Sequence, residues 1–184
     1  MSVTPVAHPD LRSRLAAVEL LLVDVDGVLT DGGVTLDARG EETKTFHTRD
    51  GLGLRLWLRA GWRAGIVTGR ASGAVAARAA ELGITILHQG VGDKLAAVRS
   101  IVDGCGLSWE QTAFVGDDLP DLEVVRRCGV GVAVADACAE VRAAADLVTT
   151  LPGGRGAVRE TIERLLDARG AWHAAVAGVT GGTA

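Results

Sequence analysis

Short apolar runs alternate along this chain with longer segments of helical periodicity, and this alternation constrains the fold more than any other feature. The apolar runs occupy residues 20–23, 64–67, 84–87, 112–115 and 130–134, with a weaker one at 147–148. Runs of this length without polar alternation predict strands buried on both faces. The segments between them carry apolar residues at three- and four-residue spacing, at residues 52–60, 72–82, 94–102, 121–128, 139–145 and 158–168. The sequence therefore predicts an α/β fold, a Rossmann-like three-layer α/β/α arrangement around a parallel sheet.

One segment, residues 33–47, interrupts this rhythm with two short strand-like stretches around a glycine-containing loop. It predicts a small β-hairpin, inserted after the first strand at the edge of the sheet where ligands bind. We expect this hairpin to act as a flap, since it is too short to form a large cap domain. The remaining chain predicts one domain over residues 18–168, preceded by a lead-in at 1–17 and followed by a disordered tail at 169–184.

Glycines lie at the ends of several predicted helices. Each of four helical segments is followed by a glycine, namely Gly61, Gly83, Gly106 and Gly129. Because a helix often ends in a left-handed residue that glycine adopts without strain, we expect a positive φ at each of them.

The bulk composition narrows the possible partners. The 184 residues carry a net charge of −4 and no cluster of Lys or Arg, which argues against nucleic acid. No apolar run approaches the roughly 18 residues needed to cross a bilayer, so no membrane partner is expected. The three cysteines, Cys105, Cys128 and Cys138, form no CxxC pair, which is compatible with a reducing, cytoplasmic location.

The sharpest chemical feature is Asp24-Val25-Asp26-Gly27, directly after the first strand. As the chain turns at Gly27, the two carboxylates converge, and like charges that close require a cation or a proton between them. Mg²⁺ suits such oxygen ligands. One carboxylate can then attack phosphorus while the other protonates the leaving oxygen and later activates water. The alternative is a pair of loop aspartates in an ordinary turn.

Three further features follow other predicted strands. Asp117, Asp118 and Asp121 would complete a carboxylate cluster at the same sheet edge, although capping of the next helix explains acids there equally well. Thr68 stands where an apolar strand stops and can hold phosphate oxygens, unless it is only a strand-end residue. Lys94 opens a helix, where a cation is slightly unfavourable, so that a phosphate-neutralising role competes with that of an ordinary surface lysine.

Taken in this order along the chain, these features resemble the four motifs of the haloacid dehalogenase superfamily of phosphatases, over roughly residues 18–168. The resemblance implies that Asp24 is the nucleophile and passes through an aspartyl-phosphate intermediate. It implies that Asp26 is the general acid and base, and that Thr68 and Lys94 hold the phosphoryl group.

The same resemblance implies a Mg²⁺ site. Asp24, the backbone carbonyl of Asp26, and Asp117 would be its protein ligands. Asp118 would either ligate weakly or orient a metal-bound water. Asp121 is interpreted as supporting the ligands or capping a helix.

Other segments resemble one group within the superfamily, the capless 3-deoxy-D-manno-octulosonate 8-phosphate phosphatases. They are residues 31–33, 49–53, 69–70, 116–118 and 153–160. This resemblance implies a small phosphorylated sugar acid as substrate, a role in lipopolysaccharide biosynthesis, and a homotetramer that the hairpin helps to assemble. The substrate-binding residues that it implies are His47, Thr48, Arg49, Asp50, Gly51, Arg55, Gly69, Arg70, Arg78 and Lys94.

Several alternatives stay open at this point. Arg55 and Arg78 are also explained by a solvated helix face, and His47 by a structural role. A nine-carbon, sialic-acid-type 9-phosphate is the alternative substrate. A phospho-receiver domain shares the fold and uses Asp, Thr and Lys, but its third strand ends in Asp, whereas the run at 84–87 is followed by His88-Gln89. A non-catalytic module would not need the acidic motifs.

Overall fold

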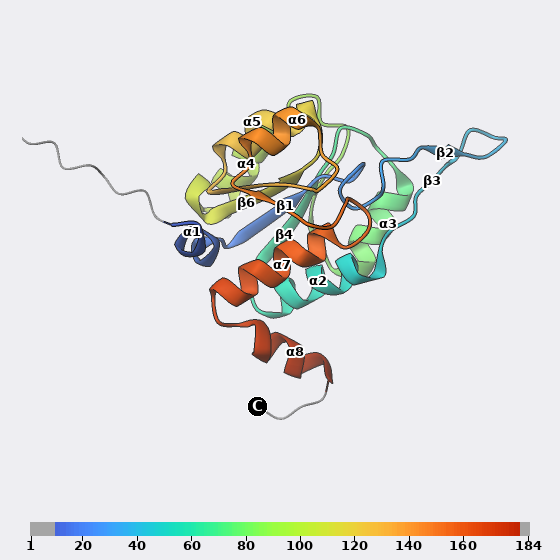
Figure 1. Cartoon of the computed structure of the whole chain (residues 1–184). Helices are drawn as coiled ribbons and strands as arrows, with labels where there is room; N and C mark the ends of the chain where they lie inside the picture. The colour runs from blue at the N-terminus through green and yellow to red at the C-terminus, as the bar shows by residue number, and fades with distance from the viewer. Residues whose placement is uncertain (1–9, 181–184) are drawn as a thin grey trace, which may run out of the picture.

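The computed structural model describes residues 10–180, and a six-stranded parallel sheet forms its centre (Figure 1). The strands lie in the order β5-β4-β1-β6-β7-β8. Their bounds are β1 (Leu20–Val23), β4 (Arg63–Val67), β5 (Ile86–His88), β6 (Thr112–Gly116), β7 (Val130–Ala133) and β8 (Leu147–Val148). Each lies within two residues of a predicted apolar run, at both ends.

Helices cover both faces of this sheet, as Figure 1 shows. One face carries α2 (Thr48–Arg59), α3 (Gly73–Leu82) and α7 (Ala157–Ala168), with α2 packed along α7. The other carries α4 (Lys94–Cys105), α5 (Leu122–Arg127) and α6 (Ala139–Ala144). The predicted three-layer α/β/α arrangement is thus confirmed. Two short 3₁₀ turns, Trp109–Gln111 and Leu119–Asp121, precede β6 and α5.

The core lies between these layers and is built mainly from Val, Leu, Ile and Ala. All four residues of β1 are fully buried, which is why the run carries no polar alternation. Trp57 is the largest buried side chain, and its indole N–H donates to the carbonyl of Arg63 at 2.7 Å. A rigid sheet centre of this kind fixes the positions of the loops that leave its strands.

The predicted hairpin is present as a two-stranded antiparallel sheet, β2 (Thr35–Leu36) and β3 (Glu42–Thr43). Its tip projects away from the body of the molecule, while its base returns towards α2 (Figure 1). Val34, which precedes β2, and Leu36 on β2 are exposed.

Two expectations from the sequence are wrong. Gly129 has no positive φ, unlike Gly61, Gly83 and Gly106; a side chain there would lie 2.2 Å from the carbonyl oxygen of Glu110, so close packing explains this glycine. The tail is not disordered over Trp172–Thr180, which forms helix α8 and packs against α2 and α7.

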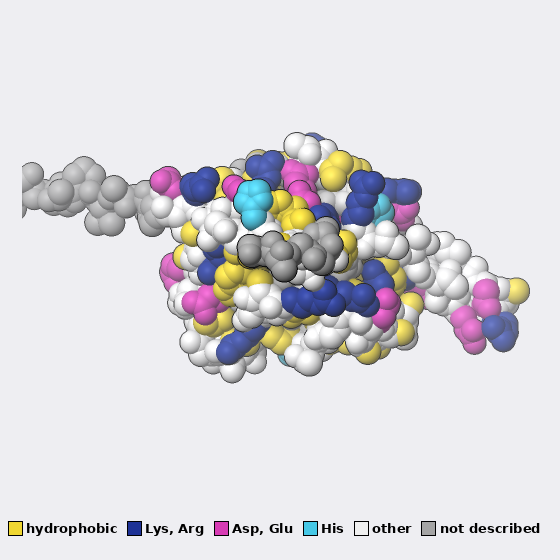
Figure 2. Space-filling model, turned by 90° about the horizontal axis from the view of Figure 1, so that it is seen from below, with side chains coloured by type: hydrophobic (Ala, Val, Ile, Leu, Met, Phe, Trp, Pro, Cys, Tyr) yellow, Lys and Arg dark blue, Asp and Glu magenta, His cyan; other side chains and the backbone are white. Residues whose placement is uncertain are grey.

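One further helix, α1 (Leu11–Ala17), precedes the sheet. It lies within the predicted lead-in and is capped by Asp10, while residues 1–9 and 181–184 fall outside the described range. Acidic and basic side chains are interspersed over the face that carries α8 (Figure 2). None of the helices between residues 10 and 180 has the length and apolar character that a membrane crossing requires.

Candidate active site

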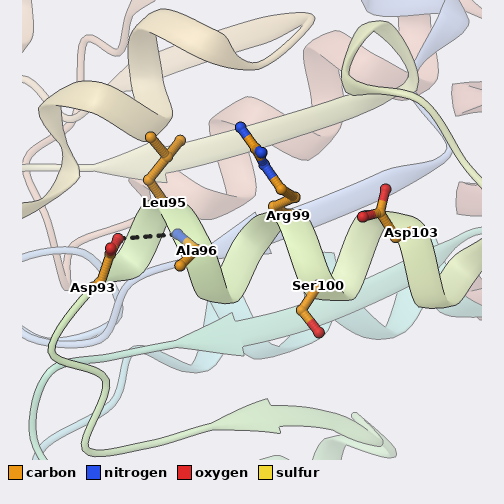
Figure 3. A pocket seen from close by; sticks show the side chains of 6 residues that line it. All are labelled: Asp93, Leu95, Ala96, Arg99, Ser100 and Asp103. Carbon is orange, nitrogen blue, oxygen red and sulfur yellow. Dashed lines mark hydrogen bonds between the residues drawn. The ribbon is translucent and has the colours of Figure 1, made fainter.

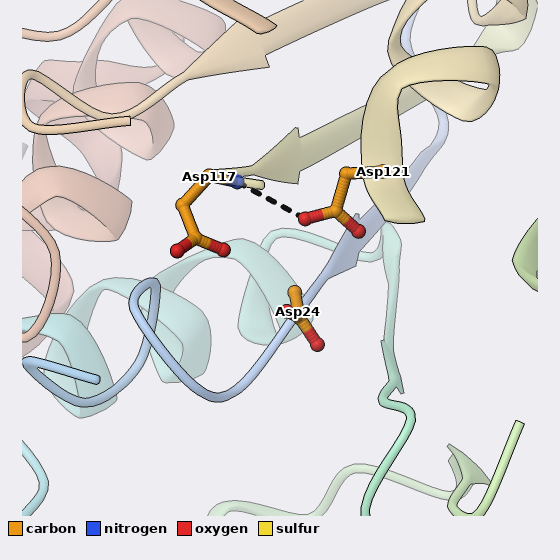
Figure 4. A group of neighbouring side chains, drawn as sticks. All are labelled: Asp24, Asp117 and Asp121. Atoms are coloured by element: carbon orange, nitrogen blue, oxygen red, sulfur yellow. Dashed lines mark hydrogen bonds between the residues drawn. The ribbon is translucent and has the colours of Figure 1, made fainter. Parts of the chain in front are cut away.

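Three carboxylates from two neighbouring strand ends meet at one edge of the sheet. Asp24 follows β1 and Asp117 follows β6, and these strands pair directly with Val23 opposite Val115. One carboxylate oxygen each of Asp24, Asp117 and Asp121 lies within 4.8 Å of the others (Figure 4). The central expectation, that acids from separate stretches of chain gather in one small volume, is met.

Gly27 makes room for this gathering. Its φ is +82°, and a Cβ at this position would lie 2.0 Å from Oδ2 of Asp117. Any side chain would therefore both strain the backbone and displace the carboxylate. The glycine of the Asp-x-Asp-Gly motif is required by the geometry of the acid on the neighbouring strand.

Lys94 is buried among the carboxylates at the start of α4. Its Nζ lies 2.6 Å from Oδ1 of Asp121 and 3.0 Å from Oδ2 of Asp24. Burial alone would lower the pKa of Lys94, but the charges of Asp24 and Asp121 outweigh burial and raise it. This lysine is a fixed cation of the site and not a solvated surface residue.

The two strand-end acids hold their protons unusually tightly. Burial, followed by the charge of Asp121, raises the pKa of Asp24 to about 6 against the opposing effect of Lys94. Burial and the charges of Asp121, Asp24 and Asp118 raise the pKa of Asp117 to about 7. Two carboxyl groups held in this way gain most from a shared cation, which would replace their protons.

A buried oxygen without a hydrogen-bond partner also supports a Mg²⁺ site. Oδ1 of Asp24 is buried and has no hydrogen-bond partner among the described residues. Buried charged oxygens without a partner are costly, so this one calls for a ligand. Carboxylate oxygens are the donors that Mg²⁺ prefers, and Asp24 with Asp117 supplies them.

Asp121 joins the cluster more closely than the sequence suggested, and Asp118 less. Asp118 is exposed and is not one of the three acids that gather. Oδ2 of Asp121 accepts the backbone N–H of Asp117 at 3.0 Å, while its Oδ1 accepts from Lys94. Asp121 therefore fixes both the loop after β6 and the lysine. Its position four residues after Asp117, on a one-turn 3₁₀ helix, was the sequence feature that could have revealed this.

A cavity of about 400 Å³ opens above these groups. Its lining residues are Asp24, Asp26, Gly32, Thr68, Gly69, Arg70, Val91, Gly92, Lys94, Asp117, Asp118, Pro120 and Asp121. Eight of the residues predicted to form the site are therefore brought together. The Asp26 carboxylate stands apart from the three clustered acids and pairs with Lys44, a residue that the sequence did not single out.

The remaining predicted substrate-binding residues do not line this cavity within one chain. They are His47, Thr48, Arg49, Asp50, Gly51, Arg55 and Arg78. Arg55 and Arg78 both pair with Glu81 on α3. Asp50 is buried, and its carboxylate accepts the backbone N–H groups of Gly156 and Arg159 at the start of α7.

A second hollow, of about 480 Å³, runs along the outer side of α4 (Figure 3). It is lined by Asp93, Leu95, Ala96, Arg99, Ser100 and Asp103. Asp93 is engaged in capping α4 through the N–H of Ala96 at 3.0 Å. The two hollows are similar in size, but the one along α4 gathers no buried charge, so we assign the chemistry to the cavity at the sheet edge.

Comparisons with known proteins agree with this assignment. Residues 76–157 match the haloacid dehalogenase-like hydrolase family model. The 3-deoxy-D-manno-octulosonate 8-phosphate phosphatase KdsC of Escherichia coli K12 is 44% identical over 161 residues, which cover 88% of this chain and 86% of that protein.

Solved structures of similar proteins extend the comparison. The 3-deoxy-D-manno-octulosonate 8-phosphate phosphatase of Moraxella catarrhalis, in complex with magnesium, phosphate and KDO, has a TM-score of 0.89 and 41% identity, covering 91% of this chain and 97% of that one. The cobalt-bound enzyme of Haemophilus influenzae has a TM-score of 0.84 and 40% identity, covering 86% and 93%. Because relatives that are more than 40% identical cover most of its length, the chain belongs to the haloacid dehalogenase-like hydrolases, in the 3-deoxy-D-manno-octulosonate 8-phosphate phosphatase family.

Proposed function

We propose that this protein is a Mg²⁺-dependent phosphatase that hydrolyses 3-deoxy-D-manno-octulosonate 8-phosphate. The observation that carries the proposal is the buried, unpartnered oxygen of Asp24 beside Asp117 and Lys94. A carboxylate held in this way has one oxygen free for a metal or for phosphorus, and a fixed cation next to the other. The substrate is that of the relatives with over 40% identity.

The reaction divides between two carboxylates. An oxygen of Asp24 attacks phosphorus, the bond from phosphorus to the sugar oxygen breaks, and Asp26 gives its proton to that leaving oxygen. A water molecule then attacks the aspartyl phosphate and returns a proton to Asp26. Inorganic phosphate leaves, and both carboxyl groups are restored to their starting states.

The other residues of the cavity hold the phosphoryl group. Lys94 neutralises its charge, while Thr68 and Gly69, at the end of β4, face its oxygens. Mg²⁺, held by Asp24 and Asp117 with the Asp26 carbonyl and Asp118 beside it, supplies further neutralisation of the transferring group. Asp121 orients both Lys94 and the loop that carries Asp117.

Recognition of the sugar acid falls to the arginines. Arg70 lines the cavity and offers a guanidinium fork to an oxyanion. The residues at 47–49, with Arg55 and Arg78, would complete the site from a neighbouring subunit of a homotetramer that the hairpin helps to assemble, whereas Asp50 and Gly51 are buried within their own chain. The position of residues 47–49, Arg55 and Arg78 outside the chain's own cavity supports this proposal, and light scattering that gives a monomer mass would contradict it. We place the enzyme in the cytoplasm, in lipopolysaccharide biosynthesis.

Phosphate release from a panel of sugar phosphates tests the function. We expect the eight-carbon keto-acid 8-phosphate to give the highest kcat/KM, above nine-carbon 9-phosphates and hexose phosphates, and activity to disappear with EDTA and return with Mg²⁺. Asp24→Asn should abolish turnover while the fold persists. Preference for a nine-carbon 9-phosphate would overturn the substrate, and near-normal kcat in Asp24→Asn would overturn the mechanism.

A further inference from the structure

Four charged side chains form a closed ring at the mouth of the active-site cavity. Lys44, just after β3, pairs with Oδ1 of Asp26. Arg70 approaches the other oxygen of Asp26 at 3.8 Å. Glu42 on β3 joins the two cations, 2.6 Å from Arg70 and 3.4 Å from Lys44. The hairpin thus supplies two of the four members, and the catalytic motif and the strand β4 loop supply one each.

The two cations of this ring differ in exposure. The Arg70 side chain is 51% exposed and lines the cavity. The Lys44 side chain is 1% exposed and is not among the lining residues. A buried ammonium is costly unless it is paired, and within the described residues its acidic partners are Asp26 and Glu42. Lys44 is therefore placed to act on the Asp26 carboxylate and not on the substrate.

We propose that Lys44, anchored by Glu42, is a positioning residue for Asp26. This inference rests on the proposed function, in which Asp26 gives its proton to the leaving oxygen as the bond from phosphorus breaks. A short carboxylate side chain at a loop has several rotamers, and proton transfer needs a fixed distance to that oxygen. Lys44 selects one of these rotamers, so the hairpin contributes to the chemistry from within its own chain.

The dependence of kcat/KM on the leaving group distinguishes a positioning role from a merely structural one. Loss of a structural residue would lower kcat/KM equally for all substrates. Phenolate from phenyl phosphate is more basic than p-nitrophenolate, and a sugar alkoxide is more basic than both. The more basic the leaving oxygen, the more its departure depends on a well-placed proton donor. Because kcat/KM covers the steps up to phosphorylation of Asp24, a misplaced Asp26 lowers kcat/KM most for the sugar phosphate and least for p-nitrophenyl phosphate.

The test compares Lys44→Met with the wild type on these three substrates at saturating Mg²⁺. We expect kcat/KM to fall by about 10- to 100-fold for the sugar phosphate, less than the roughly 10²- to 10⁴-fold that a general acid contributes because Asp26 itself remains, and by less than about threefold for p-nitrophenyl phosphate. Lys44→Arg should recover most of the loss. In an Asp26→Asn background, Lys44→Met should cost nothing further, since the group that it positions is gone.

Arg39→Met is the matched control. Arg39 is the other hairpin cation with two acidic partners, Asp37 and Glu41, but it lies at the exposed tip. Its replacement should leave all three kcat/KM values unchanged. If Lys44→Met fails to fold, Glu42→Gln, which removes the anchor and keeps the ammonium, should give the same leaving-group pattern with a smaller amplitude.

The outcomes separate this inference from the proposed function. Equal losses on all three substrates in Lys44→Met and Glu42→Gln, or additive losses in the double variant, overturn the positioning role while the phosphatase stands. A wild-type enzyme that hydrolyses the two aryl phosphates but not the eight-carbon 8-phosphate overturns the proposed substrate, and the aryl pair still tests Lys44. A wild-type protein that releases phosphate from none of them overturns both.

Discussion

At the scale of single residues, Gly27 shows how tightly the acidic motifs depend on each other. A Cβ at Gly27 would lie 2.0 Å from Oδ2 of Asp117, which belongs to a loop 90 positions later in the chain. We predict that Gly27→Ala weakens Mg²⁺ activation by at least about tenfold, because the carboxylate must move away from Asp24. The Mg²⁺ concentration for half-maximal phosphatase activity measures this effect.

A second glycine, Gly40, separates the effect of backbone strain from that of the steric clash with Asp117. Gly40 at the hairpin tip has nearly the same φ, +79° against +82°, and a Cβ at Gly40 would meet nothing within 4 Å. Gly40→Ala should cost about 1–2 kcal/mol of unfolding free energy from its left-handed backbone and leave Mg²⁺ activation unchanged. Equal Mg²⁺ requirements in the two alanine variants would contradict the steric argument for Gly27.

The neighbouring acids Asp118 and Asp121 offer a comparison at the same scale. In Asp121→Asn, one amide oxygen can still accept the N–H of Asp117, but the NH₂ group then faces Lys94, which is also a donor. We predict that Asp121→Asn lowers kcat by roughly 10-fold or more, and that Asp118→Asn, at an exposed position, lowers it less. Steady-state kinetics at saturating Mg²⁺ measures both values of kcat. A larger loss in Asp118→Asn than in Asp121→Asn would show that Asp118 has the larger role.

At the scale of elements, Asp50 ties α2 to α7. The helix α7 has a glycine at its N-cap position, Gly156, with no side-chain cap of its own, and the carboxylate of Asp50 takes that place from α2. Burial raises the pKa of Asp50 despite these two backbone donors. The loop before α7 packs on the catalytic loop, since Gly154 donates its N–H to the carbonyl of Val28 at 2.8 Å.

Removal of this cap should therefore reduce stability. We predict that Asp50→Ala lowers the free energy of unfolding by about 1–3 kcal/mol, the usual cost of a lost helix cap with buried N–H groups left unpaired. Asp50→Asn, which keeps an acceptor, should lose less. Asp103→Ala, at an exposed position of α4, serves as control and should stay within about 0.5 kcal/mol of the wild type. Urea denaturation measures all three, and an Asp50→Ala midpoint equal to that of the control would exclude the cap.

The elements themselves were largely predictable, because local patterns determine them. The buried strands were predictable from unbroken apolar runs. The hairpin was predictable because residues 33–47 interrupt the alternation of strands and helices. The sequence could not separate Gly129 from the C-cap glycines, because its role is close approach to Glu110, which depends on tertiary packing. The helix α8 was missed for the same reason: its Ala-rich sequence has weak periodicity, and it is stabilised by contact with α2 and α7.

The site residues likewise divide into those that local sequence patterns predict and those that depend on tertiary contacts. The structure brings Asp24, Asp26, Thr68, Lys94 and Asp117 to one cavity, and the sequence could place them together because each follows a strand or opens a helix at the carboxyl edge of the sheet. Lys44 lay in the hairpin without any motif, and its pairing with Asp26 is visible only in three dimensions. The predicted roles of residues 47–51 in substrate binding stay predictions.

At the scale of the whole molecule, the strand order explains where the site lies. From β1 the chain moves to β4 and β5 on one side, and then crosses to β6, β7 and β8 on the other. The loops after β1 and β6 therefore leave in opposite directions, and ligands of open α/β sheets bind in the crevice between such loops. The acid cluster occupies this point, so the fold concentrates negative charge where the sheet offers a crevice.

This concentration of charge couples the stability of the protein to pH and Mg²⁺. The pKa values of Asp24 and Asp117 are raised to about 6 and about 7, from 3.8 in an unfolded chain. A raised carboxyl pKa gives stability that is fully present below pH 3.8 and is lost as pH rises through the folded value. In EDTA, we predict that the contribution of this pair to Tm falls as the pH rises from about 5 to 8.

Mg²⁺ should reverse this trend, because it binds the ionised pair and stabilises the folded state by mass action. We therefore expect the increase in Tm on adding Mg²⁺ to be small near pH 5 and to grow towards pH 8. The control is the double variant Asp24→Asn, Asp117→Asn, in which neither side chain titrates; subtracting its Tm removes the contribution of all other groups. Thermal denaturation of both proteins, with EDTA and with Mg²⁺, gives the four curves. Should the wild type and the double variant show the same pH slope in EDTA, the acid cluster would not be the source of this linkage.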